Sequence, residues 1–248
     1  IKLSQLAGTT CRKGMPAVGL TDSGNLFGLM KFHRACMQAG VKPLVGSDLR
    51  VSVGGDPFLL PVLAMNQIGY KNLLSIVSNG YVGSTDRGVV PIEDLSNYGE
   101  GLLVLSGGIS GDVGSALVRD DYEKAKNAAI QWSKKFPGRY YLEISRTGRP
   151  EEENYISVIL KLSEELELPV VATNDVRFIG PEDFEAHEAR VCIYQGRSLD
   201  DPRRTRQYSA DQYLKTPEEM AALFSDIPEA LENSVAIAQR CSVSLETG

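Results

Sequence analysis

Short apolar runs alternate with amphipathic stretches along the chain as far as Thr173. The runs predict buried strands because they are short and are bounded by glycine, proline or polar residues. The stretches between them place apolar residues three or four positions apart, which is the period of a helix. Such alternation favours an α/β fold with a largely parallel sheet, either a barrel or an open sheet. The expected strands cover residues 16–20, 42–53, 57–64, 102–105, 140–144 and 169–173.

The connections between these elements are short, so no domain boundary stands out. A chain of 248 residues can bury a sizeable core by itself. We therefore expect a single barrel-like domain over residues 1–248, with the barrel core over 1–180 and a mainly helical part over 181–248. The absence of a methionine at Ile1 indicates a fragment of a longer protein.

Three local features are also expected. Pro150 is suited to the first turn of a helix that ends at Leu166. Residues 216–219 read Thr-Pro-Glu-Glu, which is a helix-capping box with proline at the first helical position. A polar, glycine-containing loop is expected over 82–88.

Composition excludes several classes of function. The net charge of −6 lacks the basic field that non-specific DNA binding needs. Only 2 histidines are present, which argues strongly against sites that hold several metals through imidazoles. The four cysteines form no C-x-x-C pair and are expected to be free thiols in a reducing compartment. The longest apolar run, 58–65, is far shorter than the ~20 residues of a membrane helix. We therefore expect a cytoplasmic protein that does not contact a membrane.

Short stretches of apolar and small residues in several of the predicted strands lead to an acidic residue. The acidic residues are Asp22, Asp48, Glu143 and Asp175. Because chemistry in α/β folds lies at the carboxyl ends of strands, these carboxylates could converge on a cation site. The alternative, favoured by pattern alone, is that Asp22 and Asp175 cap helix N-termini.

Two segments could contact an anion. Residues 107–114 are rich in glycine and lead from a strand into a helix, as a phosphate-binding turn does. They match neither G-x-G-x-x-G nor the Walker sequence, so a tight turn is the favoured interpretation over an anion contact through Gly108, Ser110 and Gly111. The second segment holds Arg203, Arg204 and Arg206, for which a solvated loop is the default and a phosphate contact the alternative.

Neither histidine fits a catalytic set well. His33 lies on the apolar face of its predicted helix and is expected in or near the core. His187 has Asp183 one helical turn before it, and Ser110 or Ser23 could complete a Ser-His-Asp set. No G-x-S-x-G motif is present, so a serine hydrolase is disfavoured.

Seven strings in one order make the chain resemble a known family. They cover residues 14–28, 41–48, 66–73, 105–108, 141–144, 171–176 and 186–188. Together they resemble the PHP (polymerase and histidinol phosphatase) domain of bacterial DNA polymerase III alpha subunits, most closely the proteobacterial type. The resemblance implies a distorted barrel of seven β/α units, with a metal cluster at the carboxyl ends of the strands in active members. It also implies that a first strand, carrying a His-x-His pair in active members, precedes Ile1.

The resemblance further implies that the metal site is degenerate. The family's Asp-His pair stands as Asp22 and Ser23, and its Asp-x-His as Asp175 and Arg177. Glu143 matches a retained acid. The two remaining ligand positions, a glutamate and a histidine in active members, hold Asp48 and Leu59.

Three metals need several neutral imidazoles, which these positions no longer supply. We therefore expect no metal, no cofactor and no catalytic residue in this domain, although weak residual divalent binding remains compatible with its acids. Our hypothesis is that Arg177 replaces the missing positive charge by pairing with some of Asp22, Glu143 and Asp175. The alternative is that Arg177 points into solvent.

The resemblance implies a DNA-directed DNA polymerase as the parent protein, a nucleotidyltransferase of DNA replication whose Mg²⁺ lies in another domain. The domain itself is expected to be an inactive structural and docking module. Its expected partners are the polymerase core of the same chain and a proofreading exonuclease subunit, with DNA bound through other domains. The alternatives are an active metal-dependent phosphoesterase or 3′–5′ exonuclease, and a phosphate-binding module built on residues 107–114.

Overall fold

A computed structural model describes residues 1–82, 86–204 and 206–245. Residues 83–85, which belong to the loop expected over 82–88, lie outside the described residues, as do 205 and 246–248. The strands are β1 (Ala17–Ser23), β2 (Lys42–Ser52), β3 (Phe58–Ala64), β4 (Val89–Pro91), β5 (Leu102–Leu105), β6 (Tyr140–Ser145) and β7 (Val170–Thr173).

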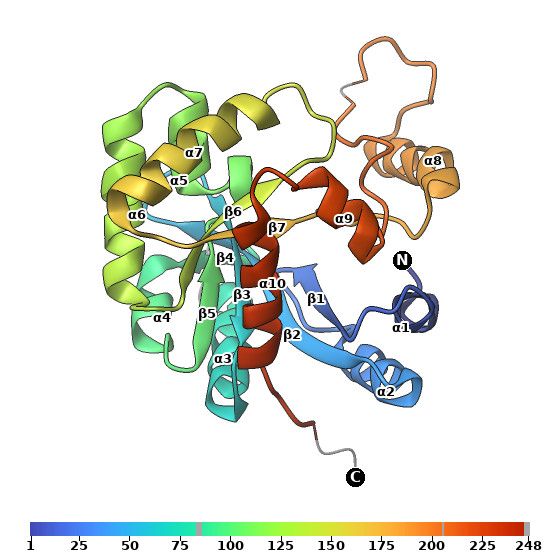
Figure 1. Cartoon of the computed structure of the whole chain (residues 1–248), viewed down its shortest axis with the longest axis horizontal. Coiled ribbons are helices and arrows are strands. Elements are labelled where there is room, and N and C mark those ends of the chain that lie inside the picture. The colour runs from blue at the N-terminus through green and yellow to red at the C-terminus, as the bar shows by residue number, and fades with distance from the viewer. Residues whose placement is uncertain (83–85, 205, 246–248) are drawn as a thin grey trace.

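Helices follow most strands, as the alternating pattern predicts (Figure 1). They are α1 (Leu3–Arg12), α2 (Leu29–Ala39), α3 (Gln67–Val82), α4 (Ile92–Asn97), α5 (Asp112–Val118), α6 (Tyr122–Lys135), α7 (Glu152–Leu166), α8 (Phe184–Gln195), α9 (Pro217–Leu223) and α10 (Pro228–Arg240). Two short 3₁₀ turns, Gly108–Ser110 and Pro181–Asp183, precede α5 and α8.

The strands form one curved sheet in the order β1-β2-β3-β5-β6-β7, and β4 pairs with the end of β2. Four of its pairings are parallel, so the expectation of a largely parallel sheet is confirmed. The strand β3 runs antiparallel to both β2 and β5 because a short turn over 53–57 folds it directly back onto β2. Among the described residues β1 and β7 do not pair, so the sheet is an open part of a barrel.

The two faces of the sheet pack against different layers. Alternate strand residues such as Leu49, Leu60 and Leu142 are fully buried in the large core with the outer helices. The opposite face contributes Leu103 and Tyr141 to a smaller cluster, which Ile237 and Cys241 at the end of α10 complete. Asp48 and Glu143 lie an even number of positions from members of this second cluster, so they share its concave face.

Specific hydrogen bonds hold α10 across the strands (Figure 1). Lys42 Nζ donates to the carbonyl of Ala238 at 2.7 Å, and Asn233 Nδ2 donates to the carbonyl of Val170 at 2.7 Å. Beyond the helix, the amide of Ser242 donates to the carbonyl of Met65 at 2.8 Å. These contacts make α10 part of the central body, whereas α8 protrudes from it.

Local features differ from expectation at two places. The prediction that Pro150 lies in the first turn of a helix is wrong, because α7 begins at Glu152. The carboxylate of Glu152 accepts the amides of Thr147 and Arg149, which keeps the chain before it in a loop. The short β4 and α4 were not expected, since neither is long enough to show a period.

The capping box before α9 is confirmed. Thr216 Oγ1 accepts the amide of Glu219 at 3.2 Å, and Glu219 Oε2 accepts the amide of Thr216 at 2.7 Å. Within the described part of the chain, no helix is both long enough and apolar enough to cross a membrane.

Candidate functional site

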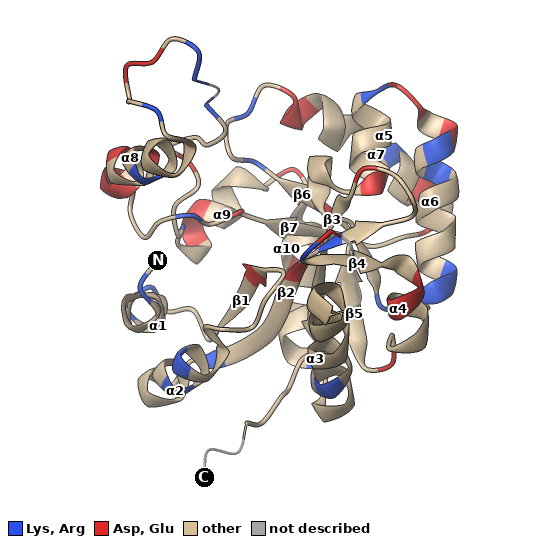
Figure 2. Cartoon of the chain, turned by 180° about the vertical axis from the view of Figure 1, so that it is seen from behind, with Lys and Arg blue, Asp and Glu red and all other residues tan. Residues whose placement is uncertain are grey.

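The predicted site lies in, or just beyond, the carboxyl-terminal halves of the strands. Asp48 lies on β2, Glu143 on β6, and Asp175 directly after β7. Asp22 lies near the end of β1, and Figure 2 shows the acidic positions of β1 and β2 beside one another. The structure therefore brings these acids to one end of the sheet, and their individual contacts decide what they can do.

Glu143 is held by hydrogen bonds to both of its carboxylate oxygens. Oε1 accepts the hydroxyl of Thr173 at 2.7 Å, and Oε2 accepts the amide of Gly107 at 3.1 Å. Burial, together with the negative charges of Asp48 and Asp175, raises the pKa of Glu143 to about 7. The carboxyl group is therefore an internal link between three strand ends, and it is partly protonated near neutral pH.

Asp48 and Asp22 face opposite sides of their strands. In the parallel register Asp48 is beside the exposed Ser23, and Asp22 is beside Ser47. Burial raises the pKa of Asp48 to about 6, while a hydrogen bond from Thr21 and the charge of Arg177 oppose that rise. The side chain of Asp22 turns instead toward Gly28, so Asp22 does not join a cluster with Glu143.

Asp175 is the most heavily paired acid of the site. Arg177 Nη2 lies 2.5 Å from Oδ1, and Arg149 Nη2 lies 3.0 Å from Oδ2. Gln212 Nε2 also donates to Oδ2 at 2.7 Å. The backbone of Asp175 has a φ of 40°, in the left-handed region that aspartate tolerates better than most residues. This conformation and three donors fix the carboxylate in place.

The predicted ion pair of Arg177 is therefore confirmed for Asp175. No contact in the described residues pairs it with Asp22 or Glu143. The alternative that it points freely into solvent is wrong, because its guanidinium also lies over the ring of Tyr208, 5.5 Å from the ring centre.

The interpretation of Asp22 and Asp175 as helix caps is also wrong. Asp22 lies within β1, and Gly28 is the residue before α2. Asp175 is separated by several residues from the 3₁₀ turn Pro181–Asp183. Their positions after apolar runs resembled those of capping residues, but the chain continues without a helix at either place.

Leu59, which stands at a former histidine position, lies on β3 opposite Arg50. Its carbonyl oxygen is so close to Gly107 that an added Cβ would meet it at 2.3 Å. Leu59 thus contributes backbone packing to the glycine-rich turn, and its apolar side chain supplies no ligand atom.

The glycine-rich segment is a tight turn, as favoured. Gly107 has a φ of 78°, and the amides of Ser110 and Gly111 donate to its carbonyl. A Cβ at Gly111 would lie 1.7 Å from the carbonyl oxygen of Ser106. The amides of Ser110 and Gly111 are used inside the turn, which counts against an anion contact there. The contact suggested for Gly108, Ser110 and Gly111 stays a prediction.

The arginine cluster after α8 has internal partners. Arg204 Nη2 lies 2.5 Å from Glu188 Oε2, and both side chains are only 7% exposed. Arg203 pairs with Asp201 at the surface, whereas Arg206 is exposed. A joint phosphate contact by these three residues does not fit, because Arg204 is already buried against a carboxylate.

The histidines behave as structural residues. His33 is buried, as expected. His187 packs between the rings of Phe178 and Tyr208, and burial lowers its pKa. Its Nε2 has no hydrogen-bond partner among the described residues, so neither Ser23 nor Ser110 completes a catalytic set with it.

Sequence reasoning missed Arg149, Gln212 and Thr173. Thr173 ends a predicted strand and could have been found by the rule that led to the acids. Arg149 lies four residues after the end of β6, so the rule that functional residues lie at the carboxyl ends of strands points to it less directly. Gln212 lies in an irregular segment between α8 and α9, where no period or motif points to it.

The residues present do not fit the metal cluster that the family resemblance implies. Both oxygens of Asp175 are engaged by guanidinium or amide groups, and both oxygens of Glu143 accept hydrogen bonds. Within residues 1–82, 86–204 and 206–245, no three or more His, Cys, Asp or Glu side chains are grouped so that they could hold a metal ion.

Comparison with known proteins identifies relatives along the whole chain. The model of the PHP domain family matches residues 1–147. The chain is 44% identical over 253 aligned residues to the DNA polymerase III subunit alpha of Pseudomonas fluorescens. It is 47% identical over 252 aligned residues to the same subunit of Escherichia coli strain K12. Each alignment covers 100% of this chain and 22% of the relative, so the chain spans about a fifth of the length of these proteins.

Proposed function

This chain belongs to the PHP domain family, and on that premise we propose that it is a structural and docking module of a DNA polymerase III alpha subunit with no hydrolytic activity of its own. The similarity to such subunits over the whole chain supports the placement. The proposed parent extends DNA from deoxynucleoside triphosphates by phosphoryl transfer with Mg²⁺ in another domain.

The proposal rests on the contacts of the Asp175 carboxylate. This carboxylate is shared by Arg149, Arg177 and Gln212, so positive charge from the protein stands where active relatives are expected to hold a metal. Each guanidinium contacts one oxygen of Asp175 through its Nη2 atom, and a guanidinium stays charged at every physiological pH. A divalent ion would have to displace two cations before it reached this ligand.

Glu143 supports the same conclusion. Its oxygens accept hydrogen bonds from Thr173 and Gly107, and in the absence of a cation its raised pKa of about 7 leaves it partly protonated at neutral pH. The acids that active relatives would use for metal thus serve here to join β6, β7 and the turn after β5.

We extend the proposal to the architecture and the partners. The free edges of β1 and β7 would be bridged by one more strand, which would complete a distorted (β/α)₇ barrel. The proposed partners are the polymerase core of the same polypeptide and a proofreading exonuclease subunit, with DNA held by other domains in the cytoplasm.

Metal analysis together with two activity assays tests this proposal. The purified chain is incubated with Zn²⁺ or Mn²⁺, freed of excess metal by gel filtration, and analysed by mass spectrometry for bound metal. Hydrolysis of p-nitrophenyl phosphate and of single-stranded DNA from its 3′ end is measured on the same samples. We expect no stoichiometric metal and no hydrolysis. Bound metal with hydrolysis that Glu143→Gln abolishes would instead establish a phosphoesterase or 3′–5′ exonuclease.

A further inference from the structure

The first 50 residues have a charge that is opposite to that of the rest of the chain. They contain seven Lys and Arg residues and two acidic residues, whereas residues 51–248 contain 19 and 30. Both acidic residues of the first segment, Asp22 and Asp48, belong to the strand ends described above. The helices α1 and α2 therefore carry no acidic residue, and Figure 2 shows them with blue and no red positions.

A stripe of apolar side chains lies along the exposed side of α2. It consists of Phe27, Met30 and Met37, which are 87%, 44% and 62% exposed. Arg34 lies between Met30 and Met37 on the same helical face, because positions three and four apart are neighbours. Apolar side chains in such a row are usually buried, and the inward-facing residues Leu29, Phe32 and Cys36 already supply the core contacts of this helix.

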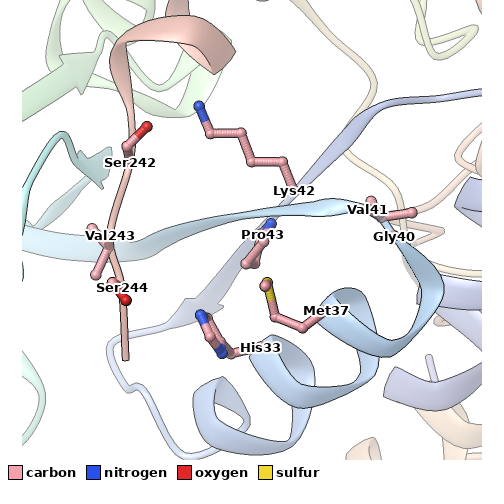
Figure 3. Close-up of a pocket in the computed structure, with 9 residues that line it drawn as sticks. All are labelled: His33, Met37, Gly40, Val41, Lys42, Pro43, Ser242, Val243 and Ser244. Atoms are coloured by element: carbon pink, nitrogen blue, oxygen red, sulfur yellow. The ribbon is translucent and has the colours of Figure 1, made fainter. Parts of the chain in front are cut away.

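A pocket continues this stripe at the end of α2. It is about 520 Å³ in volume and lies between His33 and Met37, the start of β2, and the segment 242–244. In Figure 3, His33, Met37 and Pro43 face this segment across the pocket. The accessible surface of its lining is mostly apolar, and the ammonium group of Lys42 donates to the carbonyl of Ala238, so the pocket suits an apolar side chain better than a phosphate or a base.

The cations around the stripe form no ion pair with a carboxylate of the described residues, although Arg12 Nη2 donates a hydrogen bond to Thr9 Oγ1 at 2.8 Å. Lys31 and Arg34 are exposed on α2, and neither has a carboxylate of the described residues within ion-pair distance. The helix α1 packs against α2. Lys2 beside α1 and Arg12 on α1 are also exposed and have no carboxylate of the described residues within ion-pair distance. An acidic partner would therefore meet unpaired positive charge around an apolar centre, which is the pattern of a protein interface with a polar rim.

We propose that α2 is a docking surface for an acidic amphipathic segment of a partner protein. Leucine-like side chains of that segment would lie on Phe27, Met30 and Met37, and one of them would enter the pocket beside His33. Flexible methionines suit the apolar face of a helix, because their side chains adapt to its shape. Single-stranded DNA is a poorer fit, since Phe27 is the one aromatic ring of the stripe and base stacking needs a series of them.

The inference rests on the proposed docking role, but its test is independent of the metal analysis. The probe is a fluorescein-labelled helical peptide of about 18 residues, with leucines three and four apart and glutamates on the other positions. Binding to the purified chain is followed by fluorescence anisotropy. We expect saturable binding that weakens in high salt, and no binding of a matched peptide with lysines in place of the glutamates.

Two variants locate the surface. Met30→Glu with Met37→Glu removes the apolar centre, and Lys31→Glu with Arg34→Glu reverses the rim. Each pair should weaken binding about tenfold or more. Ile193→Glu on α8 is the matched control, because Ile193 is also exposed, at 79%, and lies on another helix. Circular dichroism and thermal melting check that all variants fold.

Four results would overturn the proposal. They are no binding of the acidic peptide, equal binding by all variants, tighter binding of a thymidine oligonucleotide than of the peptide, or self-association of the chain that the α2 variants abolish. The last two would assign the surface to nucleic acid or to a second copy of the chain. A metal-binding result in the earlier experiment would leave the peptide result unchanged, so the two proposals can fail separately.

Discussion

Arg149 and Arg177 reach the same carboxylate, that of Asp175, from loops at the ends of different strands, with Nη2 atoms 3.0 and 2.5 Å from its two oxygens. Arg149 follows β6 and Arg177 follows β7. The two guanidiniums therefore connect neighbouring strand ends through one acid. This arrangement places charge of both signs where converging acids alone would repel one another.

Removing either guanidinium should destabilise the fold modestly. We expect Arg177→Ala and Arg149→Ala each to lower the free energy of unfolding by roughly 0.5–1 kcal/mol, because both pairs are partly exposed and screened by solvent. Urea unfolding at neutral pH measures the effect. Arg203→Ala, which breaks a surface pair with Asp201, is the control and should cause no measurable change. Unchanged stability in both test variants would show that Asp175 does not need these cations.

Glu143 should make stability fall as pH rises toward neutrality. Its pKa is about 7 in the folded state and near 4.5 in the unfolded chain. Below pH 4.5 the carboxyl is protonated in both states, whereas between 4.5 and 7 the unfolded chain releases its proton more readily and is favoured.

We expect ionisation of Glu143 to lower the free energy of unfolding by about 1–3 kcal/mol between pH 4.5 and pH 7. Comparing urea unfolding of the natural chain with Glu143→Gln at pH 4.5 and pH 7 isolates it, because glutamine does not titrate. Equal pH dependence in the two proteins would contradict the raised pKa.

The glycine-rich turn should tolerate a methyl group at one position and reject it at another. In Gly111→Ala the new Cβ would lie 1.7 Å from the carbonyl oxygen of Ser106. We therefore expect the free energy of unfolding to fall by about 3 kcal/mol, or the chain to fail to fold. In Gly108→Ala no atom lies within 4 Å of the new Cβ, and only the φ of 54° opposes it. The free energy of unfolding of that variant, measured by urea unfolding, should fall by about 1 kcal/mol. Similar losses in both would mean that steric contact does not define the turn.

The buried pair of Arg204 and Glu188 should hold the segment after α8. Arg204→Met leaves the carboxylate of Glu188 buried without its cation, so we expect this segment to open locally. Thermolysin cleavage between 193 and 208 should become roughly tenfold faster. Adding Glu188→Gln to Arg204→Met should restore much of the resistance, because the uncompensated charge is gone. Arg190→Met, exposed on α8, is the control, and faster cleavage there would indicate a general effect of the helix.

The strands of this fold were predictable where an apolar run exceeded a few residues. Val170–Thr173 was found because four apolar or small residues follow a proline, whereas Val89–Pro91 depends on pairing with β2 and leaves no pattern of its own. The reversal of β3 could have been inferred from the short turn before it.

The site was predictable as a set of positions but not as a set of contacts. Strand ends located Asp48, Glu143 and Asp175, because parallel strands bring their carboxyl ends together. Asp22 is separated from them by the alternation of side chains along β1, and a register error of one residue would reverse that result. Gln212 reaches Asp175 across 37 positions of the sequence, a distance that no local pattern spans.

The position of α10 has a consequence for synthesis on the ribosome. Lys42 meets its acceptor, the carbonyl of Ala238, only after 196 further residues have been made. At about 5–20 residues per second this interval lasts roughly 10 to 40 s. During that time the residues of this face that have already been made, first Leu44 and Leu63 and later Leu103 and Tyr141, lack the helix that covers them. The nascent chain therefore exposes apolar sheet surface until α10 has been made, which makes this face a natural binding site for chaperones.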